Sequence, residues 1–292
     1  MTMTRRRLMP AVLLFVLAGC SVNQTGPQSD AGPLPSIDRS AYSGVHAQLD
    51  HATAEIRMPM DSYEVNADES MIITAANMYI IEGCMKKAGI TMPEKHGDLD
   101  VKADQSYGVW VPEHAAKYGY VRPTVRTIPG IYDSGTRDSP QAAVKKYFEC
   151  DNSTAGDQIP AFRSRVAGQD SLLTTIVNDS NALAERDPMW KSIREAWIKC
   201  LGDSGITMRQ DSPDAWVPSY PADRQGEIRT ALQDTECKSK TNMMQGLMDI
   251  RAQYQAALIE THQGALNTLA DEKSAALAKA KDILRQHGHG GL

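Results

Sequence analysis

The sequence lacks the motifs that mark most enzymes and cofactor-binding proteins. It contains no His-Glu-x-x-His or Cys-x-x-Cys zinc motif, no Gly-x-Ser-x-Gly elbow, no phosphate-binding loop and no dinucleotide fingerprint. Aromatic residues make up only 6% of the chain, which argues mildly against surfaces that stack sugars or bases. We therefore expect no catalytic residues, no metal site and no cofactor.

Long apolar runs are also scarce. The run near the start, Leu8 to Ala18, has 11 residues and includes Pro10, whereas a bilayer-spanning helix needs about 20. Three arginines precede this run, and it leads into Leu17-Ala18-Gly19-Cys20. A charged start, a short apolar stretch and a small-residue cleavage site are typical of a secretion signal. No later stretch is long and apolar enough to cross a membrane.

A cysteine directly after the cleavage site resembles a bacterial lipoprotein signal. The resemblance implies that residues 1–19 are removed and that Cys20 carries lipid. Each buried CH₂ group of an acyl chain contributes about 0.8 kcal/mol, so the two or three chains of a lipoprotein hold it stably. We expect a lipid-anchored protein at the extracytoplasmic face of the cell membrane. The alternatives are an ordinary secretion signal that ends near a cysteine and, for export, the twin-arginine route.

The charge of the mature chain argues against a nucleic-acid partner. The chain has 31 basic and 36 acidic side chains, and residues 1–19 hold three of the basic ones and no acidic one. Removing them leaves 28 basic and 36 acidic side chains, a net charge of −8. An acidic domain without a Lys/Arg cluster binds nucleic acid poorly and is not drawn to an anionic membrane by charge.

Parts of the sequence occur twice. The stretch from Cys84 to Met92 matches the stretch from Cys200 to Met208 at the cysteine and in the run Gly-Ile-Thr-Met. Each copy is followed by a Trp-Val-Pro triplet and then by a Glu-Cys pair, in the order Trp110-Val111-Pro112, Glu149-Cys150, Trp216-Val217-Pro218, Glu236-Cys237. We interpret residues 61–160 and 161–240 as two copies of one module, with chance similarity as the alternative.

Each copy contains a predicted helix that ends at a glycine. Residues 71–88 and 189–204 carry apolar side chains at helical spacing, and Gly89 and Gly205 follow them. Glycine easily adopts the left-handed conformation that closes a helix in a Schellman motif.

The cysteines that follow Cys20 indicate two disulfides. An even number of cysteines in an exported protein is typical of disulfide bonding, with free buried thiols as the alternative. Four cysteines allow three connectivities. Cys84 and Cys200 each fall on the buried side of the last turn of a predicted helix, where they can link that helix to the segment that ends the same repeat. This favours the pairs Cys84–Cys150 and Cys200–Cys237.

The remaining segments differ in composition. Residues 20–60 are predicted to be a flexible tether, rich in Ser, Gly, Pro, Asn and Gln over 21–44, with a short helix over 45–56 that ends before Pro59. Residues 171–186 form another predicted helix. Residues 93–140 are predicted to be mostly loop with at most short strands.

The C-terminal stretch 241–286 predicts one long helix, followed by a tail over 287–292. It contains no proline and has a narrow apolar stripe, and Gly288 is a natural end. At 1.5 Å per residue this helix would extend about 70 Å, and Gly246 and Gly264 are candidate bends. Two interpretations are open: a helix that lies along the repeats, or a coiled-coil arm that binds itself or a partner.

Several side chains are weak candidates for a site. His46, Asp50 and His51 could touch one metal, but they border the tether and are better explained as solvated side chains. For His287 and His289 in the tail, a frayed end is the simpler interpretation. Packing is favoured over ligand binding for the two tryptophans of the repeated triplet, Trp110 and Trp216. Nothing pairs the carboxylates predicted on loops, which include Asp98, Asp100, Glu113 and Asp214.

Three stretches resemble uncharacterised actinobacterial secreted lipoproteins. They are Cys84-Met85-Lys86-Lys87-Ala88-Gly89 with its second copy, Tyr107-Gly108-Val109 followed by Ala115-Ala116-Lys117-Tyr118-Gly119-Tyr120, and Asp234-Thr235-Glu236-Cys237-Lys238-Ser239-Lys240-Thr241 before a long helix. The resemblance spans about residues 56–285, although Ile90 and Ile206 stand where that family tends to place an aromatic residue. It implies an envelope location and paired cysteines, and it implies no activity.

Together these features predict a mainly α fold: a duplicated, disulfide-stapled helical module with long irregular loops and a long C-terminal helix. We expect a non-enzymatic interaction or structural protein of the cell envelope, which docks a protein partner through the long helix or the repeat loops. The main alternative is a solute-binding lipoprotein of a transporter, with the ligand between the two modules. An enzyme such as a cell-wall hydrolase ranks last.

Overall fold

The computed structural model describes residues 33–91, 97–100, 103–121, 124–128, 140–160, 172–212 and 214–289. The chain divides into two units, residues 1–34 and 35–292, and the elements described below belong to the second. The predicted signal peptide (1–19) and the predicted lipid-bearing Cys20 lie outside the described residues.

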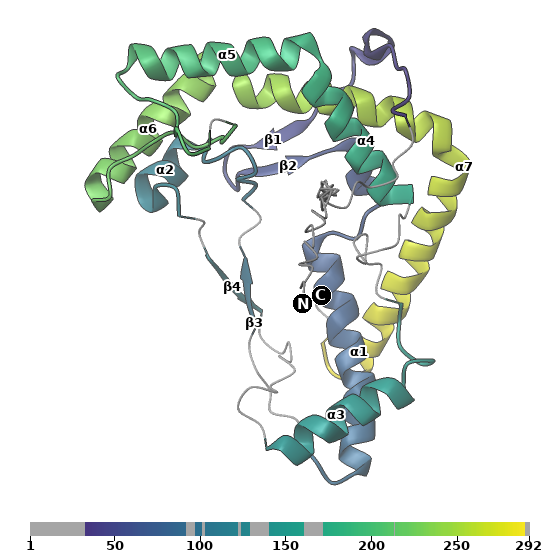
Figure 1. Ribbon diagram of the computed structural model, residues 1–292. Coiled ribbons are helices and arrows are strands. Elements are labelled where there is room, and N and C mark those ends of the chain that lie inside the picture. Colours follow the sequence, from purple (N-terminus) through teal and green to yellow (C-terminus); the bar gives the residue numbers. More distant parts are fainter. Residues whose placement is uncertain are drawn as a thin grey trace, which may run out of the picture. The chain divides into compact units, whose positions relative to one another are not determined.

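The second unit is mainly α-helical, as predicted, and Figure 1 shows its elements. Two antiparallel strand pairs, β1–β2 and β3–β4, accompany the helices. The strands are β1 (Gln48–Asp50), β2 (Glu55–Arg57), β3 (Gly97–Asp100) and β4 (Thr124–Ile128), and the short 3-10 helices are η1 (Arg39–Tyr42) and η2 (Pro59–Ser62). The α-helices are α1 (Ala67–Lys87), α2 (Pro112–Tyr118), α3 (Gln141–Ser153), α4 (Leu172–Arg186), α5 (Pro188–Asp203), α6 (Arg224–Lys240) and α7 (Met243–Gln286).

The long helix α7 is the element on which most of the other helices pack. It contacts α1, α4, α5, α6, η1 and η2. Figure 1 shows it running first beside α5 and then turning to run beside α1. Its apolar stripe therefore contributes to three buried clusters in turn, represented by Leu247 with Trp197, Leu266 with Ile176, and Leu284 with Ile73. Because this chain's own helices cover the stripe, the helix lies along the rest of the fold instead of projecting as a coiled-coil arm.

The two glycines of α7 differ in their surroundings. A Cβ on Gly246 would lie 2.8 Å from Ile193 Cδ1, so this glycine allows α5 to approach closely. A Cβ on Gly264 would meet nothing within 4 Å. The helix continues without interruption through both positions.

Helices α1 and α5 end in the same way. The Ile90 N–H donates to the Met85 carbonyl at 3.0 Å, and the Ile206 N–H donates to the Leu201 carbonyl at 2.9 Å. The intervening glycines, Gly89 and Gly205, have φ values of 74° and 75°. These are the hydrogen bonds and the backbone conformation of a Schellman motif, as the glycine positions predict.

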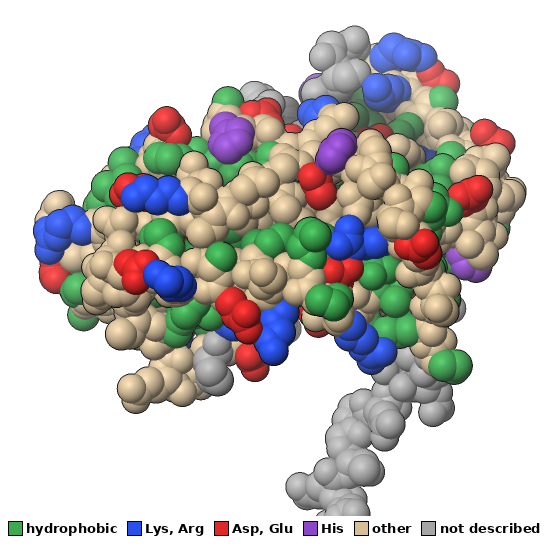
Figure 2. All heavy atoms as spheres, turned by 90° about the horizontal axis from the view of Figure 1, so that it is seen from above, with side chains coloured by type: hydrophobic (Ala, Val, Ile, Leu, Met, Phe, Trp, Pro, Cys, Tyr) green, Lys and Arg blue, Asp and Glu red, His purple; other side chains and the backbone are tan. Residues whose placement is uncertain are grey.

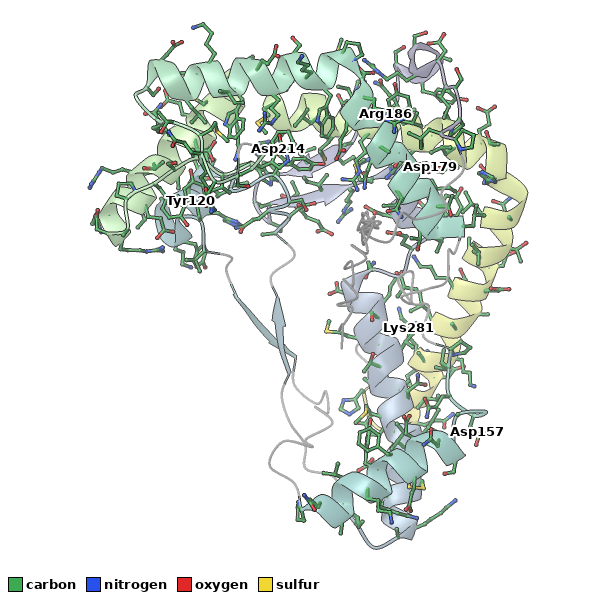
Figure 3. The ribbon with its side chains drawn as sticks, in the orientation of Figure 1. Tyr120, Asp157, Asp179, Arg186, Asp214 and Lys281 are labelled. Carbon is green, nitrogen blue, oxygen red and sulfur yellow. A yellow bond between two sulfur atoms is a disulfide. The ribbon has the colours of Figure 1, made fainter. Side chains whose placement is uncertain are left out.

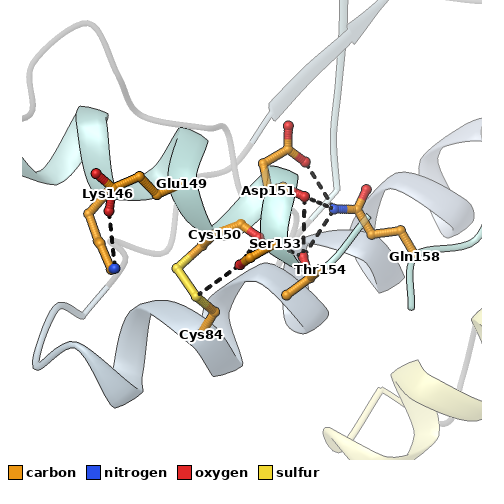
Figure 4. Close-up of a disulfide and its surroundings, with 8 residues drawn as sticks. All are labelled: Cys84, Lys146, Glu149, Cys150, Asp151, Ser153, Thr154 and Gln158. Carbon is orange, nitrogen blue, oxygen red and sulfur yellow. Dashed lines mark hydrogen bonds and ion pairs between the residues drawn. A yellow bond between two sulfur atoms is a disulfide. The ribbon is translucent and has the colours of Figure 1, made fainter. Parts of the chain in front are cut away.

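The two disulfides link these helix ends to two further helices. Cys84–Cys150 joins α1 to α3 and Cys200–Cys237 joins α5 to α6, each with a Cα–Cα distance of 5.6 Å. Both are the favoured pairs. All four cysteines lie three residues before the last residue of their helix. In α3 and α6, the hydroxyl of the threonine four residues later donates to the cysteine carbonyl at 2.8 Å, as Figure 4 shows for Thr154 and Cys150.

The segment after residue 38 differs from its prediction. Instead of a helix over 45–56 it forms the hairpin β1–β2, with Gln48 opposite Arg57. The Asp50 carboxylate accepts from the Ala52 N–H at 2.8 Å, and Ala54 takes a left-handed conformation with φ of 57°. Such a turn reverses the chain where the apolar spacing alone suggested a continuous helix.

The predicted tether over 20–60 is also too long, because its second half makes contacts with distant parts of the chain. Arg39 forms an ion pair with Asp187, and the Met60 N–H donates to the Gln255 side chain. These partners lie 148 and 195 residues further along the chain, so local composition gives no sign of them. Residues 39–60 therefore belong to the packed unit.

The segment 93–140 contains a helix that the loop prediction missed. α2 begins with Pro112 at its first turn and has no side-chain cap. It packs against α6, with Ala115 buried beside Ala231. A seven-residue helix is too short to be stable alone, so this tertiary contact is what holds it.

Candidate functional site

The candidate site lies where α6 faces α5 and the segment 103–121. α6 begins after Asp223, whose carboxylate accepts from the Gly226 N–H. Residues three and four apart share one face of a helix, so Asp234, Cys237 and Lys238 all point inward. All three are buried.

Asp234 and Lys238 form a buried ion pair. The Lys238 Nζ donates to Asp234 Oδ2 at 2.9 Å, and the two side chains are 1% and 0% exposed, respectively. The Asp234 carboxylate also accepts from Trp197 Nε1 at 2.8 Å and from the Tyr120 hydroxyl at 3.1 Å. Figure 3 places Tyr120 beside the α2–α6 contact. Three donors thus compensate for the water that the carboxylate has lost.

Burial and charge act in opposite directions on this pair. Desolvation raises the pKa of Asp234 and lowers the pKa of Lys238, while the charge of each partner opposes the shift of the other. Burial and the nearby Asp234 charge also raise the pKa of Tyr120. We assign the ionised form to the pair, because both carboxylate oxygens accept hydrogen bonds.

The ion pair fastens the segment 103–121 to α6. The Lys238 Nζ also donates to the Val109 carbonyl at 2.8 Å. Next to it, Gly108 has a φ of 73°, and a Cβ there would lie 2.6 Å from the Trp216 carbonyl oxygen and 2.9 Å from Lys238 Nζ. Both the conformation and the space therefore require glycine. A segment that lies between Cys84 and Cys150 in sequence is thus bound to the helix of the other disulfide.

The repeated tryptophans pack in different clusters. Trp110 is buried beside Ala54 and Met244, and its indole N–H donates to the Asp104 carbonyl at 2.8 Å. The Trp216 ring lies 4.9–6.0 Å from three other rings, those of Tyr107, Trp190 and Trp197. These contacts agree with the packing interpretation, although Trp110 also borders a cavity.

This cavity, of about 250 Å³, lies beside the ion pair. It is bounded by the hairpin, by Trp110, and by the turn that joins α6 to α7. We call it the Lys238 cavity. Its lining comprises Leu49, His51, Trp110, Lys238, Ser239, Asn242, Met244 and Gln245.

A larger cavity, of about 530 Å³, lies between the hairpin and the start of α1. Its charged lining is mixed, with Glu55, Arg57 and Asp61 beside His46. Desolvation raises the pKa of Asp61, opposed by the hydrogen bond from the Met58 N–H. All of its walls come from residues 46–66, so it is a feature of one local segment.

The structure does not bring the three weak metal candidates together. The Nδ1 of His46 lies 2.9 Å from Asp249 Oδ2, and Asp50 is used in the hairpin turn. His51 instead lies edge-on to Trp110, with 5.1 Å between the ring centroids. No group of three His, Cys, Asp or Glu side chains in the described part of the chain is arranged to hold a metal ion.

The other weak candidates have varied surroundings. The His287 ring stacks on Tyr79 at 4.2 Å, and the Tyr79 hydroxyl bonds to His289, so the tail is packed on α1 as far as residue 289 and is not frayed there. Glu113 lies in the first turn of α2 and Asp214 in a turn. The side chains of Asp98 and Asp100, in β3, are outside the described part of the structure.

Sequence reasoning missed the ion pair and Tyr120. A signal was present, because Asp234 and Lys238 are four residues apart and flank Cys237, which was expected to form a disulfide. Placing a helix over 224–240 would have put all three on one face. Nothing local pointed to Tyr120, which is 114 residues away from Asp234.

Among the described residues no helix has both the length and the apolar character that crossing a bilayer requires. Comparison with protein-family models, with curated proteins and with solved structures finds no match for this chain.

Proposed function

We propose that this protein is a lipid-anchored, extracytoplasmic lipoprotein that acts by binding and not by catalysis. The main observation in support of an extracytoplasmic location is the pair of disulfides, each of which joins the last turns of two helices. Such bonds persist in oxidising compartments. The lipoprotein-like run that ends at Cys20 supports the anchor, as does the resemblance to actinobacterial secreted lipoproteins.

The buried charges support a binding role. Asp234 and Lys238 are buried and hold two parts of the chain together. The apolar stripe of α7 is occupied within the chain, so a partner would have to use another surface. Among the described residues, four of the five exposed large apolar side chains lie on or next to α2, α5 and α6, namely Val121, Met189, Tyr220 and Leu232. Figure 2 shows acidic and basic side chains interspersed on the face seen from above.

The anchor is tested by replacing Cys20 with serine. The unchanged protein should incorporate an alkyne-labelled fatty acid and partition into detergent, whereas Cys20→Ser should do neither and should leave the membrane fraction. Ser21→Ala, which keeps the cysteine, is the matched control. Equal labelling of Cys20→Ser and the unchanged protein would refute the anchor.

The helix pairs α1/α3 and α5/α6 are, in this proposal, two copies of one module. Their shared Schellman ends, the equal position of all four cysteines and the matched threonine hydrogen bonds support this. The backbone around Cys84–Cys150 should superpose on that around Cys200–Cys237 in a crystal of the exported protein. Helix pairs that cross at different angles would count against duplication.

A second candidate function is solute binding for a transporter. The Lys238 cavity favours it, because Trp110 comes from the first proposed module and Lys238 from the second. A bound solute would raise the melting temperature of the protein in a screen of metabolites. A screen without any such shift would leave the docking of a protein partner as the remaining role.

A further inference from the structure

We propose that the Lys238 cavity binds a small organic anion, namely a carboxylate with an aromatic or apolar part. This inference rests on the second candidate function, solute binding, and names the class of solute. Nothing in the sequence motifs assigns this site.

The first argument is the unused hydrogen-bonding capacity of a buried cation. An ammonium group has three N–H donors. In the described part of the chain, the Lys238 ammonium donates hydrogen bonds to Asp234 and to the Val109 carbonyl. Its other neighbour there is the Trp197 ring, whose centroid is 5.4 Å from Nζ, so a third hydrogen-bond acceptor is not supplied. A carboxylate oxygen in the cavity would supply one.

The second argument is the start of α7 at the cavity. Its N-cap residue, Asn242, is left-handed (φ 49°, ψ 35°) and makes no side-chain cap hydrogen bond. Asn242, Met244 and Gln245 all line the cavity. The first N–H groups of a helix carry partial positive charge and attract anions, so an uncapped start adds to the effect of Lys238.

The third argument is the shape and character of the walls. The rings of Trp110 and His51, which lie edge-on to each other, line the cavity together with Leu49 and Met244. A volume of about 250 Å³ is below the range typical of drug-sized ligands. The walls therefore suit a flat or apolar group no larger than a single ring with a short acid side chain.

The neighbouring acidic side chains are already engaged. The Asp234 carboxylate accepts hydrogen bonds from Trp197 and Tyr120 as well as from Lys238, so Lys238 is not the sole group that stabilises its negative charge. Asp249 accepts from Gln245 and from the Ala47 N–H. These hydrogen bonds disperse the negative charge that would otherwise oppose an anion.

The test compares three probes of equal shape and different charge: phenylacetate, phenylacetamide and 2-phenylethylammonium. Each is titrated calorimetrically at low salt into the full exported chain carrying Cys20→Ser, so that no lipid is present. We expect phenylacetate to bind at least tenfold more tightly than the other two. We also expect NMR shifts at the Trp110 indole and the Asn242 amide.

The matched variants are Asn242→Asp and Asn242→Gly. Both accept the left-handed conformation, but only the first places a negative charge at the cavity, and it also favours the start of α7. Asn242→Asp should weaken phenylacetate binding about tenfold or more, whereas Asn242→Gly should change it less than threefold. Replacing Lys238 itself is unsuitable, because the unpaired Asp234 would destabilise the fold.

The outcomes separate this inference from the function on which it rests. Equal or tighter binding of the amide or the ammonium probe would overturn the anion and leave solute binding standing. NMR shifts confined to other residues, or equal effects of both Asn242 variants, would overturn the site. No binding of any probe at millimolar concentration, together with no stabilising metabolite, would overturn both.

Discussion

The helix pairs α1/α3 and α5/α6 have the same ends but different support. In α1/α3 the disulfide lies in a small cluster with Met78, Ile81 and Met85. In α5/α6 it belongs to the largest cluster, together with Trp197 and Leu247 of α7. As far as the structure describes the chain, only the second pair carries a buried ion pair that also fastens a distant segment. The Cys200–Cys237 disulfide therefore supplements a large core, whereas the Cys84–Cys150 disulfide takes the place of much of a core.

Removing the buried cation should have the largest effect. Lys238→Met leaves the Asp234 carboxylate buried without its partner, which we expect to lower the free energy of unfolding by about 3–5 kcal/mol. Urea unfolding followed by circular dichroism measures it. The control is Lys199→Met in α5, whose ion pair with Asp203 has the same spacing of four residues but is exposed. Equal losses for the two variants would show that burial does not decide the strength of the pair.

Removing each disulfide tests the comparison directly. Replacing both cysteines of either pair with alanine should lower the free energy of unfolding by about 2–5 kcal/mol. Loop entropy alone ranks Cys84–Cys150 higher by about 0.5 kcal/mol, since it closes 66 residues instead of 37.

The two disulfide variants should differ more clearly in which helices lose hydrogen-exchange protection than in how much unfolding free energy they lose. Without Cys84–Cys150, hydrogen-exchange protection should be lost in α3 and kept in α5 and α6. Without Cys200–Cys237, protection should fall across α5, α6 and the first half of α7, which share one core. Loss of protection throughout the unit in both variants would mean that α3 is not supported separately.

Substituting two glycines of nearly equal φ distinguishes the cost of backbone strain from the cost of steric crowding. Gly108 and Gly89 have φ values of 73° and 74°, but only Gly108 has neighbours that an added Cβ would meet. We expect Gly89→Ala to cost about 1 kcal/mol for the left-handed conformation, and Gly108→Ala to cost about 1–2 kcal/mol more. Thermal unfolding of the two variants measures the difference. Equal costs would mean that the contact of Gly108 with Trp216 and Lys238 relaxes freely.

The smallest expected effect concerns Asp187, at the start of α5. Desolvation tends to raise its pKa, but hydrogen bonds from Arg39, the Met189 N–H and Tyr254 outweigh it and lower the pKa. A lowered carboxyl pKa stabilises the fold above the unfolded-state value of about 3.9, and this contribution is lost as the pH falls through the folded-state value.

Asp187→Asn should therefore lower the free energy of unfolding by about 1–2 kcal/mol at pH 7. The gap between the variant and the unchanged protein should shrink as the pH falls below about 4. Asp211→Asn is the control, because Asp211 is exposed and pairs only with the nearby Arg209. A gap that stays constant from pH 7 to pH 3 would contradict the lowered pKa.

The parts of the fold that depend on near neighbours in sequence were predictable. The helix ends at Gly89 and Gly205 and the long helix up to Gln286 follow from local spacing. The pairing of the cysteines follows from their position in the repeated stretches of sequence. The hairpin β1–β2 and the packing of Arg39 on Asp187 were not, because their causes are a turn geometry and a contact across 148 residues. The site was half predictable: the Asp234–Lys238 spacing is in the sequence, but Tyr120 and the Val109 carbonyl reach it only through tertiary folding.

The position of α7 after all the elements that it contacts affects how the protein is made. Every element that it contacts is synthesised before it, including η1, which bonds to Gln253 across 214 residues. During translation, therefore, the earlier elements that pack on α7 lack this surface until α7 itself emerges. Nascent chains cut short before α7 should be recognised by chaperones and proteases as unfolded, and the core should close only after α7 has emerged from the ribosome or the export channel.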